Sequence, residues 1–163
     1  MTRKASFSLF ILCGLCVLAV LPTASAQLPL PNAIGVATGH IHLNVGDVEA
    51  QKGFWIDLGA EVTSTGSLEM LRIPGMYIIL RDREPTGPSD GSTVNHFGFS
   101  VRDYATIRSK LLARNVNVTT DNVEGKQITI LSPDGALIEF TQSDSIDVPI
   151  AFHHIHMDHT DQE

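Results

Sequence analysis

Histidine is the residue type whose placement in this chain first suggests chemistry. The chain has 163 residues and seven histidines. They lie in or beside three similar stretches, each with an Asp seven residues after its first His, at 40–47, 96–103 and 154–161. The starts are 56 and 58 residues apart, which indicates an internal repeat. Imidazole is both a common metal ligand and an acid or base near neutral pH, so these stretches are the first candidates for a site.

The first stretch opens a predicted strand, because residues 38–45 alternate polar and apolar. Alternation places His40, His42 and Asn44 on one face of that strand. Asp47 is a good N-cap for a helix that should run to about residue 58. Three short strands separated by turn residues are then expected, at 60–64, 67–73 and 76–81.

The second stretch opens the same succession after a polar, Pro- and Gly-containing linker at 82–93. A strand at 94–101 and a helix capped by Asp103 should precede three strands, at 116–120, 126–131 and 136–141. Two tandem βαβββ modules, 38–81 and 94–141, therefore form one expected domain at 38–144.

The third stretch begins like a further module, but the given sequence ends at residue 163, before a helix and three more strands could follow. We interpret residues 145–163 as a linker and the truncated start of a third module, which suggests a fragment of a longer protein with a second pair of modules. The alternative is a vestige of such a module.

The N-terminus has the features of a secretory signal peptide. Arg3 and Lys4 precede an apolar run of about 15 residues, and residues 24–26 read Ala-Ser-Ala. A retained membrane anchor is the alternative, but a spanning helix needs about 20 apolar residues. We expect residues 1–26 to be removed, residues 27–37 to form an extended lead-in, and the mature protein to be periplasmic or extracellular with no membrane attachment.

Cleavage also changes the composition of the mature chain. Cys13 and Cys16 would be lost, leaving no disulfide and no thiolate metal ligand. Nine basic residues would remain against 18 acidic ones. This acidic balance speaks against nucleic acid as a partner and favours a small molecule.

The order of elements and their doubled motifs resemble the vicinal oxygen chelate superfamily, which includes glyoxalases, bleomycin resistance proteins and extradiol dioxygenases. The resemblance covers about residues 34–144 and rests on four motifs: His40 with Asp47, the Phe-Trp pair before Leu58-Gly59, the Asn-His-Phe-Gly-Phe strand around His96, and the Asp-Gly-Ala-Leu-Ile-Glu segment ending at Glu139. It implies an α+β fold in which the two modules form a cupped mixed β-sheet with flanking helices.

The same resemblance implies a metal site. The superfamily's ligand positions match His40, His96 and Glu139, and Fe(II) or Mn(II) is the preferred ion, with Zn, Ni or Mg as alternatives. Two imidazoles and one carboxylate on separate strands can occupy three adjacent coordination positions and leave others for substrate. His42 shares the face of His40, so we expect it to act as the acid or base.

One apolar residue narrows the choice within the superfamily. Aligning Gly75 with Gly135 makes Ile79 the counterpart of Glu139. The superfamily's glyoxalases and epimerases generally carry a carboxylate or amide at that position, so Ile79 favours a three-ligand, dioxygenase-like enzyme. Asn44, Tyr77, Ile79 and Ser100 are the candidate substrate pocket.

We therefore expect an exported, divalent-metal-dependent enzyme acting on a small oxygen-chelating substrate. The alternatives are a metal-independent protein that sequesters a small molecule and a glyoxalase- or epimerase-type lyase or isomerase. A homodimer, or a missing second pair of modules, is the expected protein partner.

Overall fold

The computed structural model describes residues 31–89 and 91–158. The predicted signal peptide, the start of the lead-in and the last five residues lie outside this range. Among the described helices there is none with the length and apolar character needed to cross a membrane.

Module 1 has the predicted βαβββ order. Its elements are β1 (His40–Val45), α1 (Val48–Leu58), β2 (Glu61–Thr65), β3 (Leu68–Ile73) and β4 (Met76–Asp82). The strands form a four-stranded sheet in the order β1-β4-β3-β2, in which β1 runs parallel to β4. The first strand of the module therefore lies at the edge of its sheet.

Module 2 repeats this order and gains a strand. Its elements are β5 (Val94–Val101), α2 (Tyr104–Ala113), β6 (Asn117–Asn122), β7 (Gln127–Leu131), β8 (Leu137–Gln142) and β9 (Ile150–Met157). The sheet order is β6-β7-β8-β5-β9, with β5 parallel to β8 and antiparallel to β9. The segment interpreted from the sequence as the start of a third module thus completes the sheet of module 2, because its residues pair with the free edge of β5.

The repeated Asp has a structural role in both modules. The side chain of Asp47 accepts a hydrogen bond from the backbone N–H of Ala50 at 2.9 Å, and that of Asp103 accepts one from Thr106 at 3.1 Å. Both are N-caps, as predicted. Gly59 ends α1 with φ of 114°, a left-handed conformation that favours glycine.

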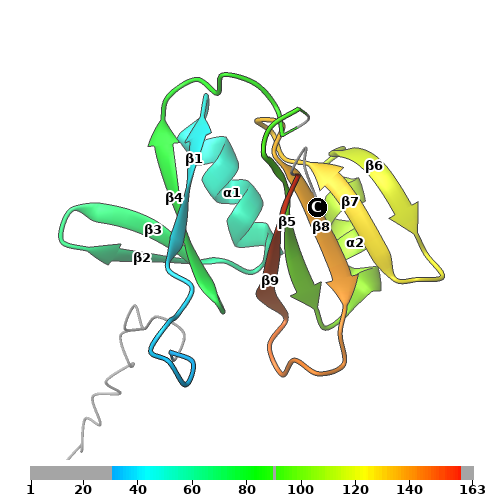
Figure 1. Cartoon of the computed structure of the whole chain (residues 1–163). Helices are drawn as coiled ribbons and strands as arrows, with labels where there is room; N and C mark the ends of the chain where they lie inside the picture. The colour runs from blue at the N-terminus through cyan, green and yellow to red at the C-terminus, as the bar shows by residue number, and fades with distance from the viewer. Residues whose placement is uncertain (1–30, 90, 159–163) are drawn as a thin grey trace, which may run out of the picture.

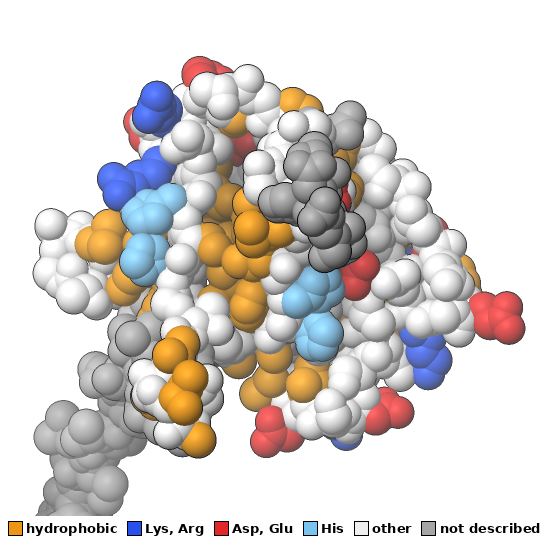
Figure 2. Space-filling view, in the orientation of Figure 1, with side chains coloured by type: hydrophobic (Ala, Val, Ile, Leu, Met, Phe, Trp, Pro, Cys, Tyr) orange, Lys and Arg blue, Asp and Glu red, His pale blue; other side chains and the backbone are white. Residues whose placement is uncertain are grey.

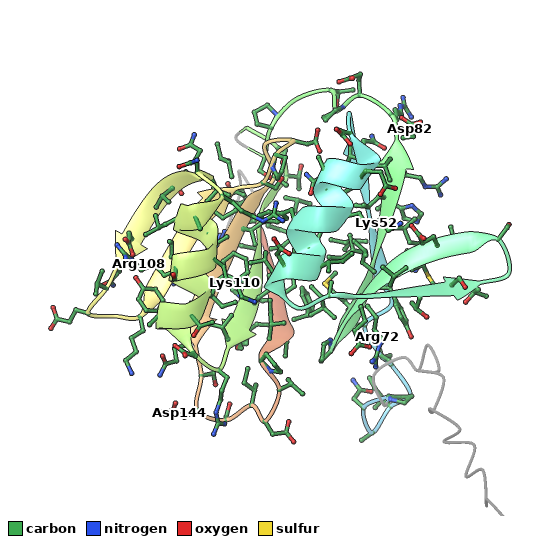
Figure 3. The ribbon with its side chains drawn as sticks, turned by 180° about the vertical axis from the view of Figure 1, so that it is seen from behind. Lys52, Arg72, Asp82, Arg108, Lys110 and Asp144 are labelled. Carbon is green, nitrogen blue, oxygen red and sulfur yellow. The ribbon has the colours of Figure 1, made fainter. Side chains whose placement is uncertain are left out.

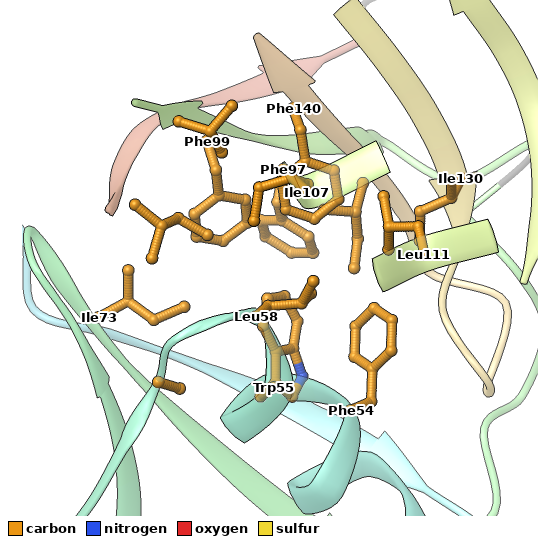
Figure 4. Close-up of a cluster of buried hydrophobic side chains, with 14 of the residues drawn as sticks. Phe54, Trp55, Leu58, Ile73, Phe97, Phe99, Ile107, Leu111, Ile130 and Phe140 are labelled. Atoms are coloured by element: carbon orange, nitrogen blue, oxygen red, sulfur yellow. The ribbon is translucent and has the colours of Figure 1, made fainter. Parts of the chain in front are cut away.

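The two modules share one hydrophobic core. Figure 1 shows the two sheets side by side, and Figure 4 shows Trp55 and Leu58 of α1 facing the phenylalanines of module 2. The rings of Trp55 and Phe99 lie 5.5 Å apart between centroids, and both side chains are fully buried. Seen from behind, α1 and α2 lie in front of the sheets, and Lys110 of α2 donates a hydrogen bond to the carbonyl of Asp57 at 2.7 Å (Figure 3). The helices cover one face of each sheet, so the opposite faces are where exposed polar groups can gather.

Candidate metal centre

Strand β5 separates core residues from polar residues by alternation. Phe97, Phe99 and Val101 belong to the hydrophobic core. His96, Gly98 and Ser100 consequently point to the opposite face, which we call the open face of module 2. The parallel neighbour β8 adds Glu139 to this face, since Glu139 pairs with Gly98.

Three ligand-type side chains meet on the open face of module 2. The ligand atoms of His96, Glu139 and His154 all lie within 4.8 Å of one another. His96 Nε2 is 3.1 Å from His154 Nε2 and 3.7 Å from Glu139 Oε2. Two donors that each lie about 2.1 Å from one ion are themselves about 3 Å apart, so this spacing suits a divalent metal.

Hydrogen bonds on the far side of each group fix its orientation. His96 Nδ1 is 2.8 Å from Asn95 Oδ1, and His154 Nδ1 is 2.7 Å from His153 Nδ1. Thr141 Oγ1 donates to Glu139 Oε1 at 3.1 Å. Such outer partners are typical of metal ligands, because they set the imidazole tautomer and the direction of the free nitrogen.

The surroundings of His96 favour the neutral form of its imidazole, which is the form that can coordinate a metal ion. Burial lowers the pKa of His96, with Glu139 opposing this shift and the neighbouring His154 and His156 adding to it. An imidazole with a lowered pKa is neutral near pH 7, and the neutral form is the one that binds metal.

Comparison with known proteins identifies the family. The sequence profile of the Glyoxalase/Bleomycin resistance protein/Dioxygenase superfamily matches residues 37–140. The chain belongs to this superfamily. No curated protein sequence is a significant match to it. The vicinal oxygen chelate resemblance inferred from the motifs is therefore confirmed, as is the α+β fold of two βαβββ modules.

Solved structures of the superfamily share the fold at low sequence identity. A fosfomycin resistance protein, FosX, from Listeria monocytogenes is 21% identical with a TM-score of 0.52, covering 64% of this chain and 90% of its own. A glyoxalase/dioxygenase from Nostoc punctiforme is 19% identical with a TM-score of 0.53, covering 63% and 88%. At these identities the similarity carries the fold alone.

The structure brings together two of the three ligands that the superfamily's motifs predicted. His96 and Glu139 lie in one group, whereas His40 lies in β1 of the other sheet and is exposed. Figure 2 shows the histidines of the visible face in two groups, separated by hydrophobic surface. His154, which the sequence assigned to an absent third module, takes the third place. Its signal was the repeat itself, because the repeat aligned His154 with both His40 and His96.

The other predicted site residues are divided between the modules. Parallel pairing of β1 with β4 puts His40 beside Tyr77 and His42 beside Ile79, so these four share one face of module 1. Tyr77 and Ile79 are 5% and 3% exposed and pack with Met70, whereas Ser100 is buried in module 2. The register also agrees with the alignment of Ile79 and Glu139, because Ile79 pairs with His42 as Glu139 pairs with Gly98.

His42 has an unexpected partner. Arg81 Nε donates a hydrogen bond to His42 Nδ1 at 2.8 Å. Partial desolvation lowers the pKa of His42, although the residue is exposed, and the charge of Arg81 and the neighbouring His40 lower it further. His42 is therefore a neutral imidazole near pH 7, which can accept a proton, but it lies outside the group that holds His96.

A cleft of about 520 Å³ opens between the modules beside the linker. Its lining includes His42 and Asn44 of β1, Phe97 of β5, and Gln51, whose Nε2 donates to Asp134 Oδ2 at 2.8 Å. Gln51 is almost fully buried, and its Oε1 has no hydrogen-bond partner among the described residues. Sequence reasoning did not predict the contact between Gln51 and Asp134, because the two side chains come from separate modules and meet only in the folded chain.

Proposed function

We propose that the protein is a divalent-metal-dependent enzyme of the superfamily that acts on a small substrate with two neighbouring oxygen atoms. The single observation that supports this most is the group of His96, Glu139 and His154, whose ligand atoms lie within 4.8 Å of one another. These side chains come from three neighbouring strands, which hold a site more rigidly than loops do.

The donor set favours particular ions and a particular reaction class. Two imidazoles with one carboxylate is the set used by non-haem Fe(II) oxygenases, so Fe(II) or Mn(II) is preferred over Zn, Ni or Mg. When bound, the ion would act as a Lewis acid and as a template for the substrate oxygens. We infer a dioxygenase-like activity, and the apolar Ile79 argues against a glyoxalase- or epimerase-type reaction.

The protein's own residues would orient the site and move protons. Thr141 holds Glu139, and Asn95 holds His96, so that the free Nε2 of His96 faces the other ligands. His156 is the nearest further imidazole, with its ring centroid 4.8 Å from that of His96. His42 remains the acid-base candidate if the third ligand is His40, because those two share a face.

The setting of this activity is also a proposal. The signal-like N-terminus supports export to the periplasm or the extracellular space. A small molecule is the proposed partner, and the edge position of β1 leaves room for a second copy of the chain.

Metal analysis joined to an oxygen-uptake assay tests the proposal. Protein reconstituted anaerobically with Fe²⁺ should retain one ion per chain after dialysis and consume O₂ with members of a catechol panel. His96→Ala and Glu139→Gln should abolish both metal retention and uptake, whereas Asp82→Asn, at an exposed residue of β4, should abolish neither. Stoichiometric metal that survives both ligand substitutions would contradict the proposal.

The cleft between the modules supports a second candidate, a binding protein that sequesters a small molecule. Its volume of about 520 Å³ falls within the range of ligand sites, and Gln51 places a free acceptor near its wall. Tight binding of an aromatic ligand by metal-stripped protein, lost in Gln51→Leu, would favour this function over the enzyme.

A further inference from the structure

We propose that β9 supplies the third metal ligand from within module 2, so that His96, Glu139 and His154 form a complete three-donor site on one sheet of one chain. This inference rests on the proposed function, because it names a ligand of the same site. It differs from the ligand set of the superfamily's motifs, in which the third donor matches His40.

A bulge in β9 turns His154 toward the other ligands. Ile150 and Phe152 pair with Val101 and Phe99 and face the core. Simple alternation would send residue 154 to the core as well, because residues two apart share a face. The register shifts by one residue between the pairs Gly98–His154 and Phe99–Phe152, which leaves His153 as the extra residue. This shift exchanges the faces and puts His154 on the open face of module 2.

Gly98 provides the space that the ring of His154 occupies. A Cβ added at Gly98 would lie 2.1 Å from His154 Cε1, 2.4 Å from Nδ1 and 2.8 Å from Nε2. Any other residue at 98 would therefore push the ring out of the group. The equivalent position of module 1 holds His42, so module 1 has no such space.

His153 gives the bulge a second effect. Its Nδ1 lies 2.7 Å from His154 Nδ1, which directs His154 Nε2 toward His96 Nε2. The extra residue of the bulge thus orients the ligand that the bulge exposes. Three features therefore act on the side chain of His154: the bulge in β9, the space at Gly98 and the hydrogen bond to His153. Together they favour a metal site that includes His154.

His40 has none of these features. It is exposed on β1, where its ring makes an edge contact with His42 at 4.9 Å between centroids. The edge of β5 that faces away from β8 is already paired with β9. Within the described residues, β1 therefore does not pair with β5, and His40 is not part of the group.

Mn²⁺ binding by the purified protein tests the inference without an activity assay. Calorimetry should give one ion per chain for the wild type. His154→Ala should weaken binding at least about 100-fold, because losing an outer partner alone costs about 10–100-fold. His40→Ala should leave binding unchanged. Met157→Ala is the matched control, since it alters an exposed residue of the same strand outside the group. Circular dichroism would establish that each variant is folded.

The outcomes separate this inference from the proposed function. Loss of Mn²⁺ in His40→Ala with retention in His154→Ala would overturn the inference and leave a metal-dependent enzyme with its third ligand in module 1. Binding that survives His96→Ala but not His154→Ala would also overturn it, as an adventitious site of the C-terminal histidines. A wild type that binds no Mn²⁺, Fe²⁺ or Zn²⁺ would overturn the inference and the proposed function together.

Discussion

At the scale of single residues, the two modules differ at two equivalent positions that lie side by side on neighbouring parallel strands. Gly98 pairs with Glu139, and His42 pairs with Ile79. In module 2 the position has no side chain and its neighbour is a carboxylate, so an imidazole from β9 can enter. In module 1 the position is itself an imidazole and its neighbour is apolar. The position of Gly98 in module 2 therefore has room for a ligand side chain from another strand, whereas the equivalent position of His42 in module 1 does not.

Gly98→Ala should consequently disrupt the group without changing any ligand. The new Cβ would lie within 2.8 Å of the ring of His154, so the ring must leave and Mn²⁺ affinity should fall by more than tenfold, as expected for a displaced ligand. Gly53→Ala is the control, because its Cβ would meet only Arg114 Nη2, at 4.0 Å. That helix substitution should leave Mn²⁺ affinity unchanged and raise the free energy of unfolding by about 0.5–1 kcal/mol. Equal Mn²⁺ affinities in the two variants would argue against contact between Gly98 and His154.

At the scale of elements, the carboxylate of Asp121 joins α2 of module 2 to β6, one of the two edge strands of its sheet. Asp121 of β6 accepts a hydrogen bond from Arg108 Nε at 2.8 Å and one from the hydroxyl of Tyr104, both on α2. These bonds, that of Arg108 first, lower the pKa of Asp121. Strand β6 lies at one edge of the five-stranded sheet and pairs with β7, so this contact adds a link to α2 beside that ladder.

The pKa shift makes the contribution of Asp121 dependent on pH. Its pKa is lower in the folded protein than in the unfolded chain, where it is about 3.9, so the ionised form stabilises the fold. That stability is fully present above about pH 4 and is lost as the pH falls through the lower folded pKa. Asp121→Asn should therefore unfold at lower urea concentration than the wild type at pH 7, and the gap should narrow toward pH 2.5 or so.

Asp82→Asn provides the comparison for this experiment, since Asp82 is exposed at the end of β4. It should show the same small difference from the wild type at both pH values. An Asp121→Asn difference that stays constant from pH 7 into the acid range would show that ionisation of Asp121 does not contribute.

At the scale of the whole molecule, the modules are held together mainly by apolar packing. Trp55 and Leu58 of module 1 and Phe99 of module 2 are buried in one cluster, and Phe152 of β9 packs against it. The backbone N–H of Phe152 also donates to the carbonyl of Pro74 in module 1 at 2.8 Å. Strand β9 thus carries the candidate ligand His154 and a contact between the modules two residues away, so the site depends on how the modules pack.

A shared core predicts that the two modules unfold together. Trp55 is the only tryptophan, so its fluorescence reports on the contact between modules, while far-ultraviolet circular dichroism reports on both sheets. The two urea transitions should coincide, as for a two-state domain. Phe99→Ala should lower the free energy of unfolding by about 3–5 kcal/mol and move both transitions equally. A fluorescence transition that precedes the dichroism transition would indicate that the modules separate before they unfold.

The sequence by itself determined the modules, their capping residues and two ligands of the candidate site. The modules and caps follow from local patterns, namely alternation along 38–45 and 94–101 and an Asp at the start of each helix. His96 and Glu139 follow from the resemblance, because they match the ligand positions of the superfamily's motifs. Each pattern extends over a few residues or over one module, where the chemistry of neighbours in sequence is enough.

Only the tertiary structure decided the third ligand. The resemblance to the superfamily predicted His40 as the third ligand, and the repeat placed His154 at the start of a further module. The choice depends on β9 pairing with the edge of β5, on the one-residue shift at His153, and on the missing side chain of Gly98. Each of these is a relation between residues more than 50 positions apart, and a one-residue change of register reverses which face a side chain occupies. Local periodicity carries no information on that register, so the packed sheet alone determines it.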